Sequence, residues 1–416
     1  MLNRRFFLGG AGAALSSFAL LPRVAHAATG SDRKFVFVFA QGGWDPTRVL
    51  ADGFDVAGVD MDPGADRATI GGLSFVDHPA RPSVRSFFEA NARRSIILNG
   101  VMVRSIAHDI CTMIAMTGGT SGLTPDWPAI LGSRERARYT LPHLVLAGPS
   151  FPGDLGVAVA RTGSAGQLDA LVDGTALANS DLPAGGPNGP AEQLLDRWLA
   201  RRSAARLAGA RSAHERRLLG DFDEATADLT ALKDLQYVMN FAGGAGVGSQ
   251  AAVAAQALSG GVSRCVTLSD NTSWDTHANN DALQSPLWDS LYAGLAELMA
   301  ILDATPGETE PTLADETTVV VLSEMGRTPA LNEFSGKDHW PYTSMMIIGG
   351  GLTGGRVVGG FDSAWYGRPV DPVSGEIAES GQVLSAEAVG ATLLALADID
   401  PGPYVSGVSP IMGILE

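Results

Sequence analysis

The chain has 416 residues, with 29 Lys and Arg against 45 Asp and Glu, and a formal net charge of −16. This acidic balance argues against nucleic acid and against an anionic membrane surface as partners, because both attract basic proteins. The length is sufficient for one large domain or two ordinary ones with a substantial core.

The first 27 residues read as an export signal rather than as part of the fold. Arg4 and Arg5 precede a short apolar stretch rich in glycine and alanine, which is the pattern of a twin-arginine signal peptide. The stretch is short for a membrane span of roughly 20 apolar residues, and Ala25-His26-Ala27 offers small residues to a signal peptidase. We therefore expect passage through the twin-arginine export machinery, cleavage after Ala27 and a periplasmic or secreted protein without a stable membrane span. An uncleaved anchor is the alternative.

Apolar runs bounded by Gly, Pro and Asp recur along residues 28–416, with helical patterns between several of them. Strands are expected at 35–43, 95–100, 143–148, 265–270, 318–324 and 345–351. Helices are expected at 105–117, 192–207, 209–240, 282–303 and 385–398. Strands this apolar predict an α/β fold with a mostly parallel sheet covered on both faces. Residues 150–260, which are rich in loops and then in charged helical patterns, predict a helical insertion or lid beside that sheet.

Polar residues gather where the predicted strands end, and in an open α/β sheet these ends form the ligand crevice. Asp45 follows the first strand, and the sequence WDTH follows the strand at 265–270. His108 begins the helix after the strand at 95–100. The other residues expected at this edge are Asp275, His277, Glu324, Arg327, Asp338 and His339. Carboxylates and neutral imidazoles are ligands of divalent metals, so the convergence predicts a site for Zn²⁺, Mn²⁺, Mg²⁺ or Ca²⁺.

Each residue taken alone has a simpler explanation. Asp45 could stabilise a turn, and Asp275 could cap a helix. Glu324 and Arg327 could form a surface ion pair worth roughly 0–1 kcal/mol, and His108 could be a hydrogen-bonded helix residue. Only the convergence of all of them at one edge favours a metal site.

The order of motifs resembles the family named domain of unknown function 1501, an exported branch of the alkaline phosphatase and sulfatase superfamily. The motifs that carry the resemblance are GGWD (42–45), AHDICTMIAMTG (107–118), WDTH (274–277), SEMGRT (323–328), KDHW (337–340) and GGGLTGGRVVGG (349–360). They cover nearly all of residues 28–416, so the resemblance implies a single alkaline-phosphatase-like domain there, a three-layer sandwich with a central, mostly parallel sheet and a helical insertion.

The resemblance also implies a function. It implies a hydrolase of phosphate or sulfate esters that depends on one or two divalent metals and acts on a small-molecule ester. The implied metal ligands are Asp45, Asp275, His277, Glu324, Asp338 and His339, with His108 as a further candidate. Arg327 would steady the developing negative charge, and the nucleophile would be an activated water or Ser105.

Two departures from the superfamily's pattern leave alternatives open. Ala107 stands before His108, where the superfamily has a nucleophilic Ser, Thr or Cys, and Met325 replaces the histidine of its Asp-His-Gly turn. A non-catalytic exported binding protein with a structural metal is therefore the second hypothesis, and an edge of salt bridges alone is the third. Cys111 and Cys265 are either buried thiols or one disulfide.

Overall fold

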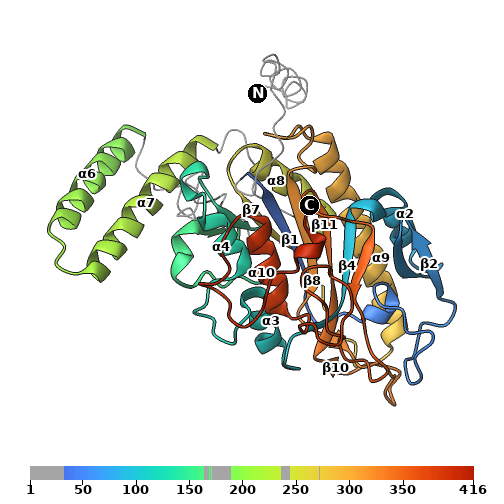
Figure 1. The fold of residues 1–416 in the computed structure, drawn as a ribbon. Helices are drawn as coiled ribbons and strands as arrows, with labels where there is room; N and C mark the ends of the chain where they lie inside the picture. The colour runs from blue at the N-terminus through green and yellow to red at the C-terminus, as the bar shows by residue number, and fades with distance from the viewer. Residues whose placement is uncertain (1–31, 164–167, 169, 171–188, 236–243, 271) are drawn as a thin grey trace, which may run out of the picture.

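The computed structural model describes residues 32–163, 168, 170, 189–235, 244–270 and 272–416 (Figure 1). The signal peptide predicted over residues 1–27 lies outside this part of the chain. Within it, no helix combines the length and the apolar character needed to cross a membrane.

An eight-stranded sheet forms the centre of the molecule. Its order is β12 (Arg356–Gly359), β4 (Ser95–Met102), β11 (Tyr342–Gly349), β8 (Thr317–Ser323), β1 (Lys34–Ala40), β7 (Cys265–Ser269), β5 (His143–Val145) and β6 (Val159–Arg161). β1 pairs in parallel with β7 and β8, whereas β11 is antiparallel to β4 and β8. The predicted α/β class with a mostly parallel central sheet is confirmed, and all six predicted strands are present.

The alternation of side chains along β1 explains why the sheet has a helical layer on each face. Val36 and Val38 belong to one buried cluster, whereas Phe35, Phe37 and Phe39 belong to another. Successive strand residues point to opposite faces, and burying one such side chain contributes roughly 1.5–3 kcal/mol. The continuous apolar run therefore requires cover on both sides.

Helices supply that cover on both faces (Figure 1). The face of Val36 and Val38 packs against α2 (Pro82–Asn91), α8 (Val247–Ser259) and α9 (Asn280–Ala304). The face of the phenylalanines packs against α3 (His108–Thr117), α4 (Trp127–Ser133) and α10 (Ala386–Leu396). Both cysteines are free thiols buried in this body, Cys111 in α3 and Cys265 in β7.

Three buried tryptophans anchor the loops that follow β1 and β7. Trp44 stacks on Trp288 of α9 with ring centroids 4.8 Å apart, and Trp274 meets Trp288 edge-on at 5.0 Å. The Trp44 indole N–H donates to Thr343 Oγ1 at 3.0 Å. Aromatic contacts of this kind fix ring orientation as well as burying area, so the residues next to Trp44 and Trp274 start from rigid positions.

Smaller elements complete the described structure. β2 (Asp66–Ile70) and β3 (Leu73–Asp77) form a hairpin, and β9 (Gly326–Arg327) pairs antiparallel with β10 (His339–Trp340). Helices α6 (Gly189–Ala208) and α7 (Ala213–Leu235) form a helical hairpin that projects away from the sheet (Figure 1). Within the range 150–260, β6 belongs to the sheet, α8 to a covering layer, and Leu232 of α7 to the buried cluster of Val36 and Val38. The part that projects is α6 and the amino-terminal part of α7. The extent of an inserted domain stays a prediction.

Candidate metal centre

Three parallel strands deliver the candidate residues to one edge of the sheet. In the register of the sheet, Ala40 pairs with Ser323 and Phe39 with Ser269, so β1, β8 and β7 end level with one another. The loops that leave them carry Asp45, Glu324 and Asp275, and the short β9–β10 ladder pairs His339 with Arg327. His108 is the first residue of α3, in the helical layer on the phenylalanine face, and its side chain extends to this same edge of the sheet.

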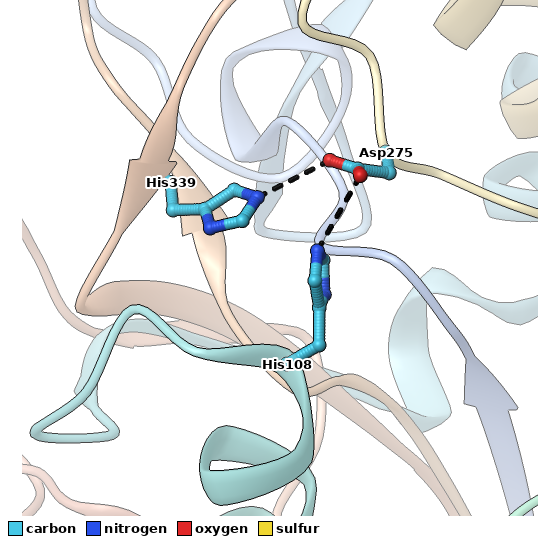
Figure 2. Close-up of side chains that lie close together, drawn as sticks. All are labelled: His108, Asp275 and His339. Atoms are coloured by element: carbon cyan, nitrogen blue, oxygen red, sulfur yellow. Dashed lines mark hydrogen bonds and ion pairs between the residues drawn. The ribbon is translucent and has the colours of Figure 1, made fainter.

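His108, Asp275 and His339 form a group at this edge that could hold a metal ion (Figure 2). His339 Nε2 lies 3.2 Å from Asp275 Oδ1, and His108 Nε2 lies 3.5 Å from Asp275 Oδ2. One ligand atom from each of the three residues lies within 4.8 Å of the other two. His277 joins the group from the side, with its Nε2 3.1 Å from Asp275 Oδ1 and 3.0 Å from His339 Nε2.

An acceptor behind each imidazole fixes its orientation. Nδ1 of His108 lies 2.9 Å from Glu324 Oε1, and Nδ1 of His277 lies 2.8 Å from Asp338 Oδ1. Nδ1 of His339 lies 2.7 Å from the carbonyl oxygen of Ile106. Because carboxylate and carbonyl oxygens only accept hydrogen bonds, these partners assign the proton of each neutral ring to Nδ1. The Nε2 lone pairs of all three histidines then face Asp275.

With these tautomers the Nε2 atoms of His277 and His339 face each other as two acceptors, while the cation beside them, Arg327, donates to Asp275 Oδ1. The two facing nitrogens of His277 and His339 are only 3.0 Å apart, next to an ionised carboxylate. Ligand atoms around a tetrahedral metal with bonds of about 2.0–2.1 Å are separated by roughly 3.3 Å, which is similar to the spacing found here. His108 Nε2 is buried and has no hydrogen-bond partner among the described residues. The donor set therefore fits a divalent metal, and three protein ligands would leave a position for substrate.

A shared proton is the competing explanation for this geometry. The hydrogen bond to Glu324 raises the pKa of His108, and Coulombic attraction to Glu324 and Asp275 acts in the same direction. A protonated His108 bridging these carboxylates would be the salt-bridge alternative weighed from the sequence.

Arg327 stabilises the ionised form of Asp275. Partial burial opposes ionisation of Asp275, but the hydrogen bond and the charge of Arg327 outweigh it and lower the pKa of Asp275 to about 2. The buried guanidinium donates to Asp275 Oδ1 at 2.6 Å from Nη2 and to the Gly43 carbonyl at 2.7 Å from Nε. It also donates to the carbonyls of Gly42, Trp274 and Lys337. Arg327 thus ties together the loops after β1, β7 and β8.

Glu324 is fully buried behind His108, on the side away from the cluster. It accepts hydrogen bonds from the Gly42 N–H at 2.7 Å and from the Ser323 hydroxyl at 3.0 Å, in addition to the His108 ring. Carboxylates in this position orient metal-binding histidines and raise their basicity. The structure places Glu324 and Asp338 on the Nδ1 atoms of His108 and His277, while their assignment as direct ligands remains a prediction from the sequence.

Asp45 lies in a separate buried network. It accepts hydrogen bonds from Arg48 Nε at 2.9 Å and from Asn280 Nδ2 at 2.9 Å, and it pairs with Lys337 Nζ at 2.9 Å. Thr47 donates to its other oxygen through both the backbone N–H and the hydroxyl. Burial disfavours the charge, but Lys337 and Arg48 hold the pKa of Asp45 well below its usual range. The structure does not bring Asp45 into the group of His108, Asp275 and His339, and its assignment as a ligand remains a prediction.

The candidate nucleophile Ser105 is held by its own turn. Its hydroxyl oxygen accepts a hydrogen bond from the Ala107 N–H at 3.2 Å, the pattern of a Ser turn just before a helix. A nucleophilic role for Ser105 stays a prediction.

A cavity of about 710 Å³ opens beside the cluster, with His108 and Asp275 in its wall. The other residues that line the cavity were not predicted from the sequence as site residues; they include Gln41, Thr112, Ser269, Thr272 and Ser273. Their place in the sequence is the one feature that could have indicated them, because Gln41 directly precedes the GGWD motif and Ser273 directly precedes the WDTH motif. Hydroxyl and amide groups dominate the polar part of this wall, and no Lys or Arg of the described residues lines it.

Comparison with known proteins gives one family match and several structural neighbours. A family described as "Protein of unknown function (DUF1501)" matches residues 92–402. No curated protein matches the chain. Among solved structures, the lipoteichoic acid synthase LtaP from Listeria monocytogenes has a TM-score of 0.41 at 9% identity, over 94% of this chain and 77% of that one. A protein in the alkaline phosphatase superfamily from Vibrio parahaemolyticus has a TM-score of 0.34 at 10% identity, over 96% and 76%. Ps i-CgsB in complex with k-i-k-neocarrahexaose has a TM-score of 0.38 at 11% identity, over 91% and 75%.

Proposed function

The chain belongs to the DUF1501 family, and from this premise we propose that it is a metal-dependent hydrolase of phosphate or sulfate esters. One observation carries the proposal: three imidazole Nε2 atoms and one carboxylate converge beside a cavity of about 710 Å³, and His108 and Asp275 of this group form part of its wall. The location at the carboxyl ends of parallel strands is where α/β folds bind ligands.

In this proposal, His108, Asp275 and His339 hold the metal. A divalent metal bound there would act as a Lewis acid on the ester oxygen. Glu324 and the Ile106 carbonyl keep the Nε2 lone pairs of His108 and His339 directed at the cluster. Arg327 keeps Asp275 ionised. His277, backed by Asp338, is placed to act as a fourth ligand or to take up a proton from a reacting water.

Arg327 is a positioning residue in this account. Its N–H groups donate to four backbone carbonyls and to Asp275, and the side chain is fully buried. A guanidinium used in this way preorganises the site rather than meeting the substrate. The function predicted for it from the sequence, direct stabilisation of developing negative charge, would require some of these bonds to be given up.

The cavity wall favours one class of ester. The hydroxyls of Thr112, Ser269, Thr272 and Ser273 can exchange hydrogen bonds with a polar, uncharged alcohol portion. Because no Lys or Arg of the described residues lines the cavity, the metal is the group that would attract an anionic phosphate or sulfate. We therefore expect esters whose alcohol portion carries hydroxyl groups but no further anionic charge.

The test is turnover by the metal-loaded protein across phosphate and sulfate esters of hydroxylated alcohols. We expect hydrolysis that chelator abolishes, and loss of activity by at least about 100-fold in Asp275→Asn and His339→Ala. His214→Ala is the matched control, because this histidine lies in α7 and outside the cluster. Metal retention without turnover of any ester would overturn the hydrolase.

That result would support the second candidate, a non-catalytic exported binding protein with the same metal. Two observations favour it: the Ser105 hydroxyl is bonded to the Ala107 N–H, and the donors of Arg327 are engaged with the protein. The two candidates are separated by single-turnover measurements, because a binder would retain an ester unchanged.

A further inference from the structure

The helical hairpin of α6 and α7 carries large apolar side chains that are exposed in the described part of the chain. Leu194, Leu195 and Trp198 of α6 are 58%, 45% and 49% exposed, and Leu218 and Phe222 of α7 are 55% and 50% exposed. We call these five residues the hairpin patch. A hollow of about 460 Å³ between the two helices is lined by Trp198, Leu218 and Phe222 together with Leu219, Arg202 and Arg206. Exposed apolar groups gathered around a hollow mark an interaction surface.

Charge is segregated along the same hairpin. Residues 197–218, which include the turn between the helices, contain seven arginines and a single acidic residue, Glu215, although the whole chain has a net charge of −16. The arginines are Arg197, Arg201, Arg202, Arg206, Arg211, Arg216 and Arg217. The part of the hairpin away from the turn carries acidic residues, Glu192 and Asp196 on α6 and Asp221, Asp223 and Glu224 on α7. Within the chain, Glu224 pairs with Arg136 at 2.9 Å and Asp221 with Arg217 at 3.9 Å. The hairpin therefore has a basic end and an acidic end, with the patch near their boundary.

The structure assigns this surface to a second copy of the chain: we propose that two hairpins pack antiparallel, about a two-fold axis near Trp198 and Phe222, into a four-helix bundle. An isologous two-fold interface requires a surface that complements itself. In the antiparallel arrangement the basic end of each hairpin meets the acidic end of the other, and the two hairpin patches bury each other. This inference is independent of the proposed catalytic function.

Other partners match only half of this surface. An anionic bilayer would attract the basic end but repel the acidic end, and an acidic protein would do the same. The size is sufficient for a dimer. A face two helices wide and 20 residues long covers roughly 30 Å by 20 Å, so two copies would bury on the order of 1,200 Å², the lower end of the range for stable, specific interfaces.

A charge-exchange experiment tests the proposal on the full mature chain. The first variant, Arg202→Glu/Arg206→Glu, makes the basic end acidic, and the second, Asp196→Arg/Asp223→Arg, makes the acidic end basic. Sedimentation equilibrium at low ionic strength should show the wild type at about twice the monomer mass and each variant alone as a monomer. An equimolar mixture of the two variants should recover the dimer, because each acidic hairpin then faces a basic one.

Two further variants separate a specific interface from a folding defect. Trp198→Asp should abolish the dimer, whereas Val373→Asp, at an apolar residue 75% exposed in a loop outside the hairpin, should leave it intact. Circular dichroism should show unchanged helix content in every variant. A monomeric wild type at 100-fold the concentration used for the variants would overturn the proposal. So would a mixture that stays monomeric, or a monomer that sediments with vesicles of phosphatidylglycerol.

Discussion

At the scale of the residue, the candidate centre depends on what stands behind each histidine. Glu324, Asp338 and the Ile106 carbonyl occupy the Nδ1 side of His108, His277 and His339, so the Nε2 atoms have one direction left. The sequence predicted that these side chains meet at one edge of the sheet. The sequence could not distinguish direct metal ligands from the groups that orient them, because an Asp or Glu near a histidine in a motif can serve either as a ligand or as a hydrogen-bond acceptor for the histidine ring.

Glu324→Gln tests that ranking. The amide keeps the size of the side chain but is a weaker acceptor for His108 Nδ1–H, so we expect metal affinity to fall by about 10–100-fold with modest loss of stability. Isothermal titration of the metal-free protein measures the affinity. Glu316→Gln is the control, because Glu316 is also fully buried and ion-paired, with Lys34 at 2.7 Å, but stands before β8 rather than after it. An equal effect of both substitutions would contradict the orienting position of Glu324.

Asp45 shows a residue whose partners the sequence could not reveal. Lys337 reaches it from a distant part of the chain, and Arg48 and Asn280 complete a buried network. Arg48 also pairs with Asp281, whose side chain is partly exposed. We expect Asp45→Asn to destabilise the protein by about 3–5 kcal/mol, because the buried Lys337 loses its counter-charge and Arg48 keeps only Asp281, at 3.1 Å. Urea unfolding measures this loss. Metal affinity at the His108 cluster should stay within a few-fold of the wild type, whereas a selective loss of metal binding would place Asp45 among the ligands.

At the scale of the element, continuous apolar runs predicted the strands and long periodic segments predicted the helices. The run in β1 and the pattern in α9 are both long enough for their period to be read. Several elements that went unpredicted are short or uniform: β6 has three residues, α4 has seven, and α8 is rich in alanine with few charges to mark a face. The ten-residue helix α2 and the strands β2 and β3 were also not predicted, although α2 has an apolar face that includes Val84, Phe87 and Phe88. The predicted end of one strand was also wrong, because β5 ends at Val145, three residues before the end of the apolar run that predicted it.

Strand β5 carries a prediction about acid stability. His143 is fully buried at the amino end of β5, away from the candidate centre, and shares a hydrogen bond with Thr267 Oγ1. Burial lowers the pKa of His143 to about 3. In the unfolded chain this histidine is protonated below about pH 6.5, whereas in the folded chain it stays neutral down to about pH 3. The free energy of unfolding therefore decreases as the pH falls through this window, by up to about 5 kcal/mol.

The matched variant is His143→Gln, which keeps a hydrogen-bonding group but does not titrate. Urea unfolding of both proteins at pH 7, 5.5 and 4 should show the advantage of the wild type shrinking as the pH decreases. Parallel curves at all three pH values would mean that His143 does not remain neutral in the folded state.

At the scale of the whole molecule, the fold was predictable and the hairpin interface was not. A mostly parallel sheet follows from the composition of its strands, whereas the pairing of two hairpins depends on which residues the fold leaves exposed. The export signal concerns residues outside the described structure, so export is still our proposal.

Arg4→Lys/Arg5→Lys should retain the protein in the cytoplasm with its leader intact, because the twin-arginine export machinery recognises both arginines. Fractionation and mass spectrometry of the amino terminus check this, and normal export of the variant would contradict it.

The central claim is that a divalent metal binds between His108, Asp275 and His339. Elemental analysis of protein purified without chelator tests it most directly, with the double variant Asp275→Ala/His339→Ala prepared in parallel. We predict about one divalent ion per chain in the wild type and less than about a tenth of that in the variant. A wild type that contains no metal, even after dialysis against Zn²⁺, Mn²⁺, Mg²⁺ or Ca²⁺, would contradict the account, as would a variant that retains the same amount.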